Sequence, residues 1–525
     1  MSHPAPPPST GAPTTGPEQT AEAKAAAAAR ADHDHGRRWW TLATLGLAQL
    51  MVVLDATIVN IALPSAQAGL GFSDADRQWV VTAYSLAFGG LLLLGGRLAD
   101  LFGRRRTLMI GLAGFAVASA LGGAATGFGL LVAARALQGA FGALLAPAAL
   151  SLLTTTFSDP RERGKAFGIF GAIAGAGAAI GLLLGGVLTE YLSWRWCLYV
   201  NVPIAVVAGL GALRFIRKVA PASGVHLDVP GVVTAVLGLS GLVYAFARAE
   251  QEGWSDPVTI TLIVVPVLLL VAFVLIQQRV AHPLLPLRVV LDRRRGGAYL
   301  AIGLAAIGMF AVFLFLTYFL QQTKGFSPLR SGFAFLPFVA GIITSSTVVV
   351  PRLLPRIGPR FLITAGQLLG AAGLVYLWRL EADSGYLAHV LPALFVMGLG
   401  MGLIFASCFN TATSGTQPAD AGVASALVNT GQQVGGALGT ALLNTIAATV
   451  TASYVRANGQ TPAALAEAAV AGETRAFLVS AGVFLLGAVL SLLVIPSGPN
   501  PVSHRGAPVP SGHCAPPSSP VTALW

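Results

Sequence analysis

Charged residues are scarce in this sequence of 525 amino acids. Only 10% of them are Asp, Glu, Lys or Arg, whereas a soluble domain carries about 25%. Hydrophobic residues make up 55%, and the mean hydropathy is +0.73. This number of charges is too small to cover the surface of a water-soluble domain. Most of the chain must therefore face lipid or other apolar helices. The composition therefore excludes an ordinary soluble enzyme or binding module.

Cysteine and histidine are also rare, and their positions exclude several kinds of chemistry. The three cysteines, Cys197, Cys408 and Cys514, lie far apart and lack the spacing of a metal site, a redox pair or a disulfide framework. Of the eight histidines, only His389 touches an apolar span, and no Gly-x-x-x-x-Gly-Lys-Ser/Thr motif is present. We therefore expect neither an enzyme nor an ATP-driven pump, and neither a metal site nor a cofactor.

Acidic residues are outnumbered by basic ones, 21 to 32, which gives a net charge of +11. In a soluble protein this excess would indicate nucleic-acid binding. Here the basic residues lie between apolar runs, as they do in loops at the face of a membrane. We expect the lipid bilayer as a partner and no nucleic acid.

Long apolar runs recur along the chain, each near the roughly 20 residues that a helix needs to cross the hydrocarbon layer. About fourteen such runs predict an all-α integral membrane protein. In order, they are Trp40–Pro64, Gln78–Leu98, Thr107–Thr126, Phe128–Leu150, Ala166–Leu188, Cys197–Phe215, Val229–Phe246, Val258–Gln277, Ala298–Leu320, Gly332–Val350, Phe361–Leu380, Leu387–Cys408, Gly422–Val450 and Ala476–Ile495.

The distribution of Lys and Arg gives the orientation. With an even number of spans, both ends of the chain lie on one side, and this side holds 22 of the 32 basic residues. The opposite side holds 8, and Arg97 and Arg135 lie within spans. Short loops rich in Lys and Arg stay in the cytoplasm, so both termini are predicted to be cytoplasmic in a cell membrane.

The turn between the second and third spans carries a dense cluster of charge. It reads Gly96-Arg97-Leu98-Ala99-Asp100-Leu101-Phe102-Gly103-Arg104-Arg105-Arg106. One interpretation is a plain positively charged anchor, which Arg104 to Arg106 alone would supply. The paired glycines and the acid at a fixed offset resemble instead the signature between the second and third helices of the major facilitator superfamily. The resemblance implies a conformational latch made by Gly96, Asp100, Gly103, Arg104 and Arg105.

Two echoes in the sequence indicate an internal repeat. The turn at Gly96–Arg105 is echoed by Pro351–Arg360 at an offset of 255, with Pro355 in place of the acid. Glu162-x-Gly164-x-Ala166 is similarly echoed by Asp420-x-Gly422-x-Ala424. Coincidence is the alternative in a chain so poor in charge. Parallel halves with a site at their interface are a recurring plan of transporters.

The repeat predicts two six-helix bundles of the major facilitator type, with two extra helices inserted between them. Segments rich in Pro, Ala, Thr and Ser at both ends bury too little apolar surface to become ordered. The predicted divisions are a disordered tail at 1–38, a six-helix bundle at 39–218, two inserted helices with a basic linker at 219–296, a second bundle at 297–496 and a disordered tail at 497–525.

Two ionisable residues lie deep within spans, where charge is costly and indicates function. Asp55 lies about 14 Å, and Arg135 about 10 Å, below the outer face at 1.5 Å per residue, close enough for a pair. A permanent ion pair that joins two helices is one interpretation, although desolvation offsets much of the attraction in such pairs. A carboxylate that loads and releases a proton is the other.

The sequence around both residues resembles the fourteen-helix drug:proton antiporters. Leu54-Asp55-Ala56-Thr57-Ile58-Val59-Asn60-Ile61-Ala62-Leu63-Pro64 is similar to that family's first-helix signature, and Arg135-Ala136-Leu137-Gln138-Gly139 to its fourth-helix motif. The resemblance implies that Asp55 and Arg135 couple transport to protons, with the proton gradient as the source of energy.

Glycines crowd the fifth span. Gly177, Gly181 and Gly185 recur every four residues and form a groove that lets another helix approach closely. Generic small-residue packing is the alternative. With Gly186, the run resembles the antiporter motif of the same family, which ends Gly-Pro-x-x-Gly-Gly. Leu182 stands where this motif has proline, so we expect this helix to be less kinked than in the family.

Evidence on the substrate is sparse. The second half shows no acidic residue within a predicted span, which favours neutral or singly charged amphipathic molecules. The family resemblance implies proton-coupled efflux of a drug, antibiotic or natural product by a monomer. A carrier for one defined metabolite, proton-linked or facilitative, is the alternative. Polar residues that we expect to line the substrate cavity are Asn60, Gln138, Asn410, Asn429 and Gln432.

Overall fold

The computed structural model is helical throughout the residues that it describes, which are 17–72, 74–157, 159–218, 227–281, 283–417 and 420–498. Thirteen helices in this part of the chain are long and apolar enough to cross a membrane, or fourteen when the bent helix α5 is counted as one span. The predicted fold class and the number of about fourteen spans are therefore confirmed.

The first half of the chain begins with one very long helix. The helices that follow it include a short one, α6, which leads into the sixth span. In order, the bounds are α1 (Pro17–Leu70), α2 (Asp74–Phe102), α3 (Arg104–Gly123), α4 (Phe128–Thr156), α5 (Pro160–Tyr191), α6 (Trp196–Tyr199), α7 (Asn201–Phe215), α8 (Val229–Glu252) and α9 (Pro257–Arg279).

The second half contains three π-helical turns, which interrupt or introduce its α-helices. In order, the bounds are α10 (Leu287–Leu291), α11 (Arg293–Tyr318), η1 (Phe319–Thr323), α12 (Pro328–Ala334), α13 (Leu336–Thr344), η2 (Ser345–Val349), α14 (Val350–Ile357), α15 (Pro359–Trp378), η3 (Tyr386–Val390), α16 (Leu391–Thr413), α17 (Ala421–Asn458) and α18 (Pro462–Val494).

The first helix extends into the segment 1–38, which the sequence predicted as a tail. Helix α1 begins at Pro17, because the run Glu22–Arg30 is rich in Ala and other strong helix formers that extend the first span. Residues 1–16 lie outside the described residues. The predicted tail at 497–525 also lies outside them, apart from Ser497 and Gly498.

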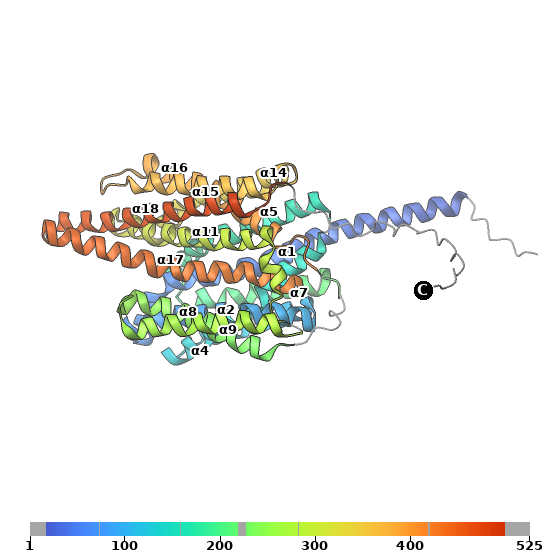
Figure 1. Cartoon of the computed structure of the whole chain (residues 1–525), viewed down its shortest axis with the longest axis horizontal. Coiled ribbons are helices and arrows are strands. Elements are labelled where there is room, and N and C mark those ends of the chain that lie inside the picture. Colours follow the sequence, from blue (N-terminus) through green and yellow to red (C-terminus); the bar gives the residue numbers. More distant parts are fainter. Residues whose placement is uncertain are drawn as a thin grey trace, which may run out of the picture.

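The helices pack side by side in two groups, with the inserted pair along one junction (Figure 1). In the first group α1 packs on α5 and α7, and α4 packs on α2 and α3. In the second group α11 packs on α17 and α18, and α15 packs on α16 and α18. Helices α8 and α9 form a hairpin, and α8 contacts both α2 and α17. The inserted pair therefore bridges the two groups.

Glycines bring the fifth helix of each group close to the first helix of the same group. A Cβ on Gly177 or Gly185 of α5 would lie 2.8 Å from the Val53 side chain or 3.0 Å from Ile58 of α1. In the same way, a Cβ on Gly439 of α17 would lie 2.8 Å from Ile307 of α11. These contacts relate α5 to α17 and α1 to α11, as a duplication would.

The two sequence echoes meet each other across the junction between the groups. Gly422 at the start of α17 lies against Gly96 of α2, and Gly164 near the start of α5 lies against Pro351 of α14. Gly96 and Pro351 occupy matching places in one echo, and Gly164 and Gly422 in the other. Each fifth helix thus begins against the second-helix turn of the opposite group.

Helix α5 is bent by 45° between Glu162–Gly177 and Ile180–Tyr191. The bend is present although Leu182 stands in place of the motif's proline, which had led us to expect a less kinked helix. Glycines such as Gly177 and Gly181 allow a sharp bend without proline.

Helix α18 corrects another expectation. It begins at Pro462, well before the predicted span Ala476–Ile495, because Thr461 caps it through a hydrogen bond from the Ala464 N–H and the next turns are rich in Ala. Glu473 therefore lies within the helix and is 94% buried. Glu473 lies in the part of α18 before the predicted span Ala476–Ile495, which itself contains no acidic residue.

Candidate functional site

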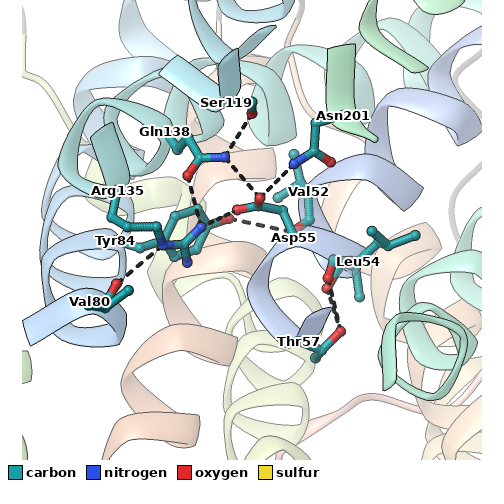
Figure 2. Close-up of polar contacts among 11 residues, drawn as sticks. Val52, Leu54, Asp55, Thr57, Val80, Tyr84, Ser119, Arg135, Gln138 and Asn201 are labelled. Atoms are coloured by element: carbon teal, nitrogen blue, oxygen red, sulfur yellow. Dashed lines mark hydrogen bonds and ion pairs between the residues drawn. The ribbon is translucent and has the colours of Figure 1, made fainter. Parts of the chain in front are cut away.

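The position of Asp55 is set by the contact between α1 and α5. A Cβ on Gly181 would overlap the Thr57 hydroxyl and lie 3.1 Å from the Leu54 carbonyl oxygen, so glycine lets α5 approach this turn of α1 closely. With that face occupied, the next residue, Asp55, points toward α4 and α7 (Figure 2). Its side chain is completely buried.

Three donors from two helices converge on the Asp55 carboxylate. Arg135 of α4 donates to Oδ2 at 2.6 Å. Gln138 of α4 and Asn201 of α7 donate to Oδ1, at 2.9 Å and 2.7 Å. A buried carboxylate with an ionic partner and two amide donors is well compensated in its charged form, because charge-assisted hydrogen bonds are the strong ones.

Arg135 is held on every side. Its Nε donates to the Val80 carbonyl at 3.2 Å, and its Nη1 also donates to Gln138 Oε1 at 3.0 Å. The guanidinium lies 4.4 Å from the centre of the Tyr84 ring, a cation–π contact. Tyr84 in turn donates to the Val52 carbonyl at 3.4 Å, one turn from Asp55. Neither member of the ion pair can move without disturbing α2.

Gln138 extends the network from α1, α4 and α7 to α3 as well. Its Nε2 lies 2.7 Å from Ser119 Oγ of α3. Ser119, Gln138 and Arg135 are all at most 1% exposed. The cluster is therefore polar and shielded from solvent in this conformation.

The sequence placed Asp55, Arg135 and Gln138 correctly near one another but missed three members of the cluster. These are Tyr84, Ser119 and Asn201, which come from three other helices. Asn201 lies at the start of α7, just after the connection that follows the fifth span, and its composition did not mark it out. Tyr84 and Ser119 had no signal, since neutral polar residues are common in spans.

The turn after α2 forms a second site, where α2 meets the start of α17. Asp100 Oδ1 accepts from the backbone N–H of Gly422, the second residue of α17, at 3.3 Å, and from Arg104 at 3.4 Å. A Cβ on Gly96 would lie 2.6 Å from the Gly422 carbonyl oxygen. The carboxylate thus meets the positive end of a helix of the opposite group.

The other two residues of the turn shape it. Gly103 has a φ of 90°, which L side chains rarely adopt, and α3 begins directly after it. Arg105 donates to the carbonyls of Ala212 and Leu213, in the last turn of α7, at 3.2 Å and 2.9 Å. Arg105 therefore ties the turn to the end of α7, through bonds that do not involve Asp100.

The five expected cavity residues lie on four helices, α1, α4, α16 and α17. Gln138 belongs to the Asp55 cluster. Asn410 accepts from Ser414 at 3.2 Å and Asn429 donates to the Ser425 carbonyl at 3.0 Å, each within its own helix. Gln432 is half-buried on α17, and the Asn60 side chain lies outside what the structure describes. Gly186, the last residue of the predicted packing motif, is buried on α5.

Comparison with known proteins identifies the family. The family model of the Major Facilitator Superfamily matches residues 45–440, which is most of the chain. The chain belongs to the major facilitator superfamily. It is therefore a multi-pass membrane transporter of small molecules and not an enzyme.

Several relatives of this transporter carry the names of antibiotics. Puromycin resistance protein pur8 of Streptomyces alboniger is 54% identical, over 90% of this chain and 94% of the relative. Cephamycin export protein CmcT of Amycolatopsis lactamdurans is 42% identical, over 76% and 83%. The tetracenomycin C resistance and export protein of Streptomyces glaucescens is 37% identical, over 79% and 76%.

A solved structure supports the fold. The human organic anion transporter MFSD10 superposes with a TM-score of 0.60 at 16% identity, over 86% of this transporter and 99% of that chain. At this identity the likeness concerns the fold alone.

Proposed function

We propose that this transporter exports amphipathic antibiotics or natural products across the cell membrane, in exchange for protons that enter. Its named relatives are resistance and export proteins for puromycin, cephamycin and tetracenomycin C, which supports export of this class of compound. The excess of Lys and Arg on the side of both termini supports a cytoplasmic location for them. The transporter acts as a monomer of two six-helix halves, residues 39–218 and 297–496.

The Asp55 cluster is the observation that carries proton coupling. A completely buried carboxylate meets one cation and two amide donors, which together compensate its charged form. Protonation of Asp55 removes its charge and weakens the ion pair with Arg135, so the protonated and charged forms favour different packings of α1 against α4. A difference of this kind is what links proton binding to a conformational change.

The contact of Asp100 with α17 is the proposed latch. It joins the two groups at their cytoplasmic ends, through Gly96, Asp100 and Gly422. The latch forms when the site opens outward and breaks when it opens inward. Gly103, Arg104 and Arg105 hold the turn in the shape that this contact needs.

Puromycin, a compound named for a 54% identical relative, is the first substrate to test. In proteoliposomes, a pH gradient should drive radiolabelled puromycin across the membrane toward the acidic side, and a protonophore should abolish this accumulation. Cephamycin and tetracenomycin C are tested in the same way. Equal movement of a compound with and without the gradient would contradict proton coupling and favour a facilitative carrier.

A further inference from the structure

The start of α17 brings two acidic residues to one helix end. Asp100 of α2 accepts from the Gly422 N–H, and Asp420, the residue directly before α17, is only 4% exposed. The partial positive charge of a helix N-terminus is about half an elementary charge. It attracts the Asp100 carboxylate, but an unpaired Asp420 two residues away would repel it.

Arg288 of the linker helix α10 neutralises Asp420. Its Nη2 donates to Asp420 Oδ2 at 2.6 Å and to Gln417 Oε1 at 3.3 Å. Asp100 has its own partner in Arg104. The matching acid of the first half, Glu162, is paired with Arg38 of α1 at 3.2 Å. Of these three acids, Asp420 alone takes its cation from the segment between the halves.

A buried polar network holds the linker in place. Gln277, near the end of α9, donates to Asp228 Oδ2 at 2.6 Å and accepts from the Leu285 N–H at 2.9 Å. Asp228 also caps α8 by accepting from the Gly231 N–H at 2.9 Å. Leu285 is buried in one apolar cluster with Val423 of α17. Arg288 is thus presented to Asp420 by both inserted helices.

We propose that Arg288 is a positioning residue of the transport cycle, through which the inserted helices set the strength of the cytoplasmic latch. It cancels the charge of Asp420, so that Asp100 can dock on the N-terminus of α17. The role in transport rests on the proposed function, whereas the effect on closure of the cytoplasmic side does not. The inserted helix α8 also bridges α2 and α17 beside this contact.

The proposal predicts opposite effects of the two single variants on the latch, and a rescue in the double variant. Arg288→Gln leaves Asp420 unpaired and should weaken the latch. Asp420→Asn removes the repulsion, so it should strengthen the latch alone and restore it in the Arg288→Gln background. Arg288→Lys keeps the charge and should keep the latch. An ion pair that only holds the fold together would be harmed by either single change, and the second change would not repair it.

Distances between two electron spin labels test these effects on the latch in the absence of substrate and of a proton gradient. Labels at Arg106 and Arg356, exposed residues on the cytoplasmic ends of the two groups, report closure in a background without cysteines. We expect Arg288→Gln to lower the ratio of closed to open molecules about five-fold, a common size for coupling between sites. Adding Asp420→Asn should return the ratio to the wild-type value.

Arg293→Gln is the matched control, because Arg293 lies near Arg288 but donates to the Leu493 carbonyl at 3.0 Å. It should leave the ratio unchanged. If the double variant stays as open as Arg288→Gln, or if Asp420→Asn alone opens the cytoplasmic side, the inference is overturned. Puromycin transport by the same variants is measured separately, so that failure of the proposed substrate leaves the result on closure standing.

Discussion

At the scale of single residues, the Asp55 cluster surrounds one buried carboxylate with donors from two helices. An isolated charge in the hydrocarbon is costly, but Asp55 has an ionic partner and two amide donors. A permanent pair needs only the cation. The amides of Gln138 and Asn201 can serve either protonation state, because a protonated carboxyl still accepts at its carbonyl oxygen.

Replacing Arg135 separates the two interpretations of the ion pair. The guanidinium stabilises the negative carboxylate, so Arg135→Ala should move the pH profile of transport toward higher pH as well as lower its maximum. The measurement is the rate of puromycin transport between pH 5 and 9, divided by the amount of folded transporter. Arg248→Ala, a change in an ion pair with Asp256 outside the spans, is the control. A loss of rate at every pH in proportion to lost protein would favour a structural pair.

Sequence alone could find Asp55 and Arg135 because charges within long apolar runs are rare. It could not find Tyr84, Ser119 or Asn201, since neutral polar side chains in spans usually bond to their own helix. Thr154, which donates to the Leu150 carbonyl at 2.9 Å, is an example. Only the packing of α2, α3 and α7 around α1 decides which of them turn inward.

At the scale of helices, the seam between α1 and α5 controls the Asp55 cluster from behind. Gly181→Ala should push α1 away from α5, because the added Cβ would lie 3.1 Å from the Leu54 carbonyl. Overpacking of this kind typically costs about 1–3 kcal/mol. We expect a lower midpoint of thermal unfolding in detergent, measured by size exclusion after heating, and slower transport. Gly482→Ala, on α18 with nothing within 4 Å, should behave as wild type. Equal melting of the two variants would contradict a tight seam.

Hydropathy predicted the number and order of the helices, because each span must be apolar over its whole length. It failed at the ends of helices beyond the apolar core. Figure 1 shows that α17 and α18 extend past the other helices, at the end away from the start of α1. Their outer turns are rich in Ala and polar residues, so they lack the apolar signal although they favour a helix.

At the scale of the whole molecule, the two groups are joined asymmetrically. The crossing at Gly96 and Gly422 carries the carboxylate of Asp100, whereas the matching crossing at Gly164 and Pro351 has Pro355 in the place of the acid. The inserted helices also lie along only the first of these two junctions. The first crossing therefore carries a carboxylate that the second lacks, and at the second Arg163 of α5 donates to Thr413 of α16 at 3.1 Å instead.

The asymmetry makes Asp100 the residue whose loss should open the cytoplasmic side. Asp100→Asn keeps the size of the side chain but removes the charge that meets α17. We expect the population to shift toward the inward-open state, with slower transport and unchanged puromycin binding. Labelling of a cysteine placed near Gly142, applied from the cytoplasmic side, should become faster. Asp76→Asn, at the opposite end of α2, is the control. If labelling is as slow as in wild type, the turn is only a positively charged anchor.

The most direct test of the account is whether the substrate moves protons through Asp55. Purified transporter in weakly buffered detergent solution, with a pH-sensitive dye, is mixed with puromycin, and binding is followed in parallel by tryptophan fluorescence. The account predicts that wild type releases protons when puromycin binds and that Asp55→Asn binds puromycin without this release. The same variant in proteoliposomes should not accumulate puromycin along a pH gradient. Proton release and gradient-driven accumulation by Asp55→Asn at the wild-type level would contradict the account.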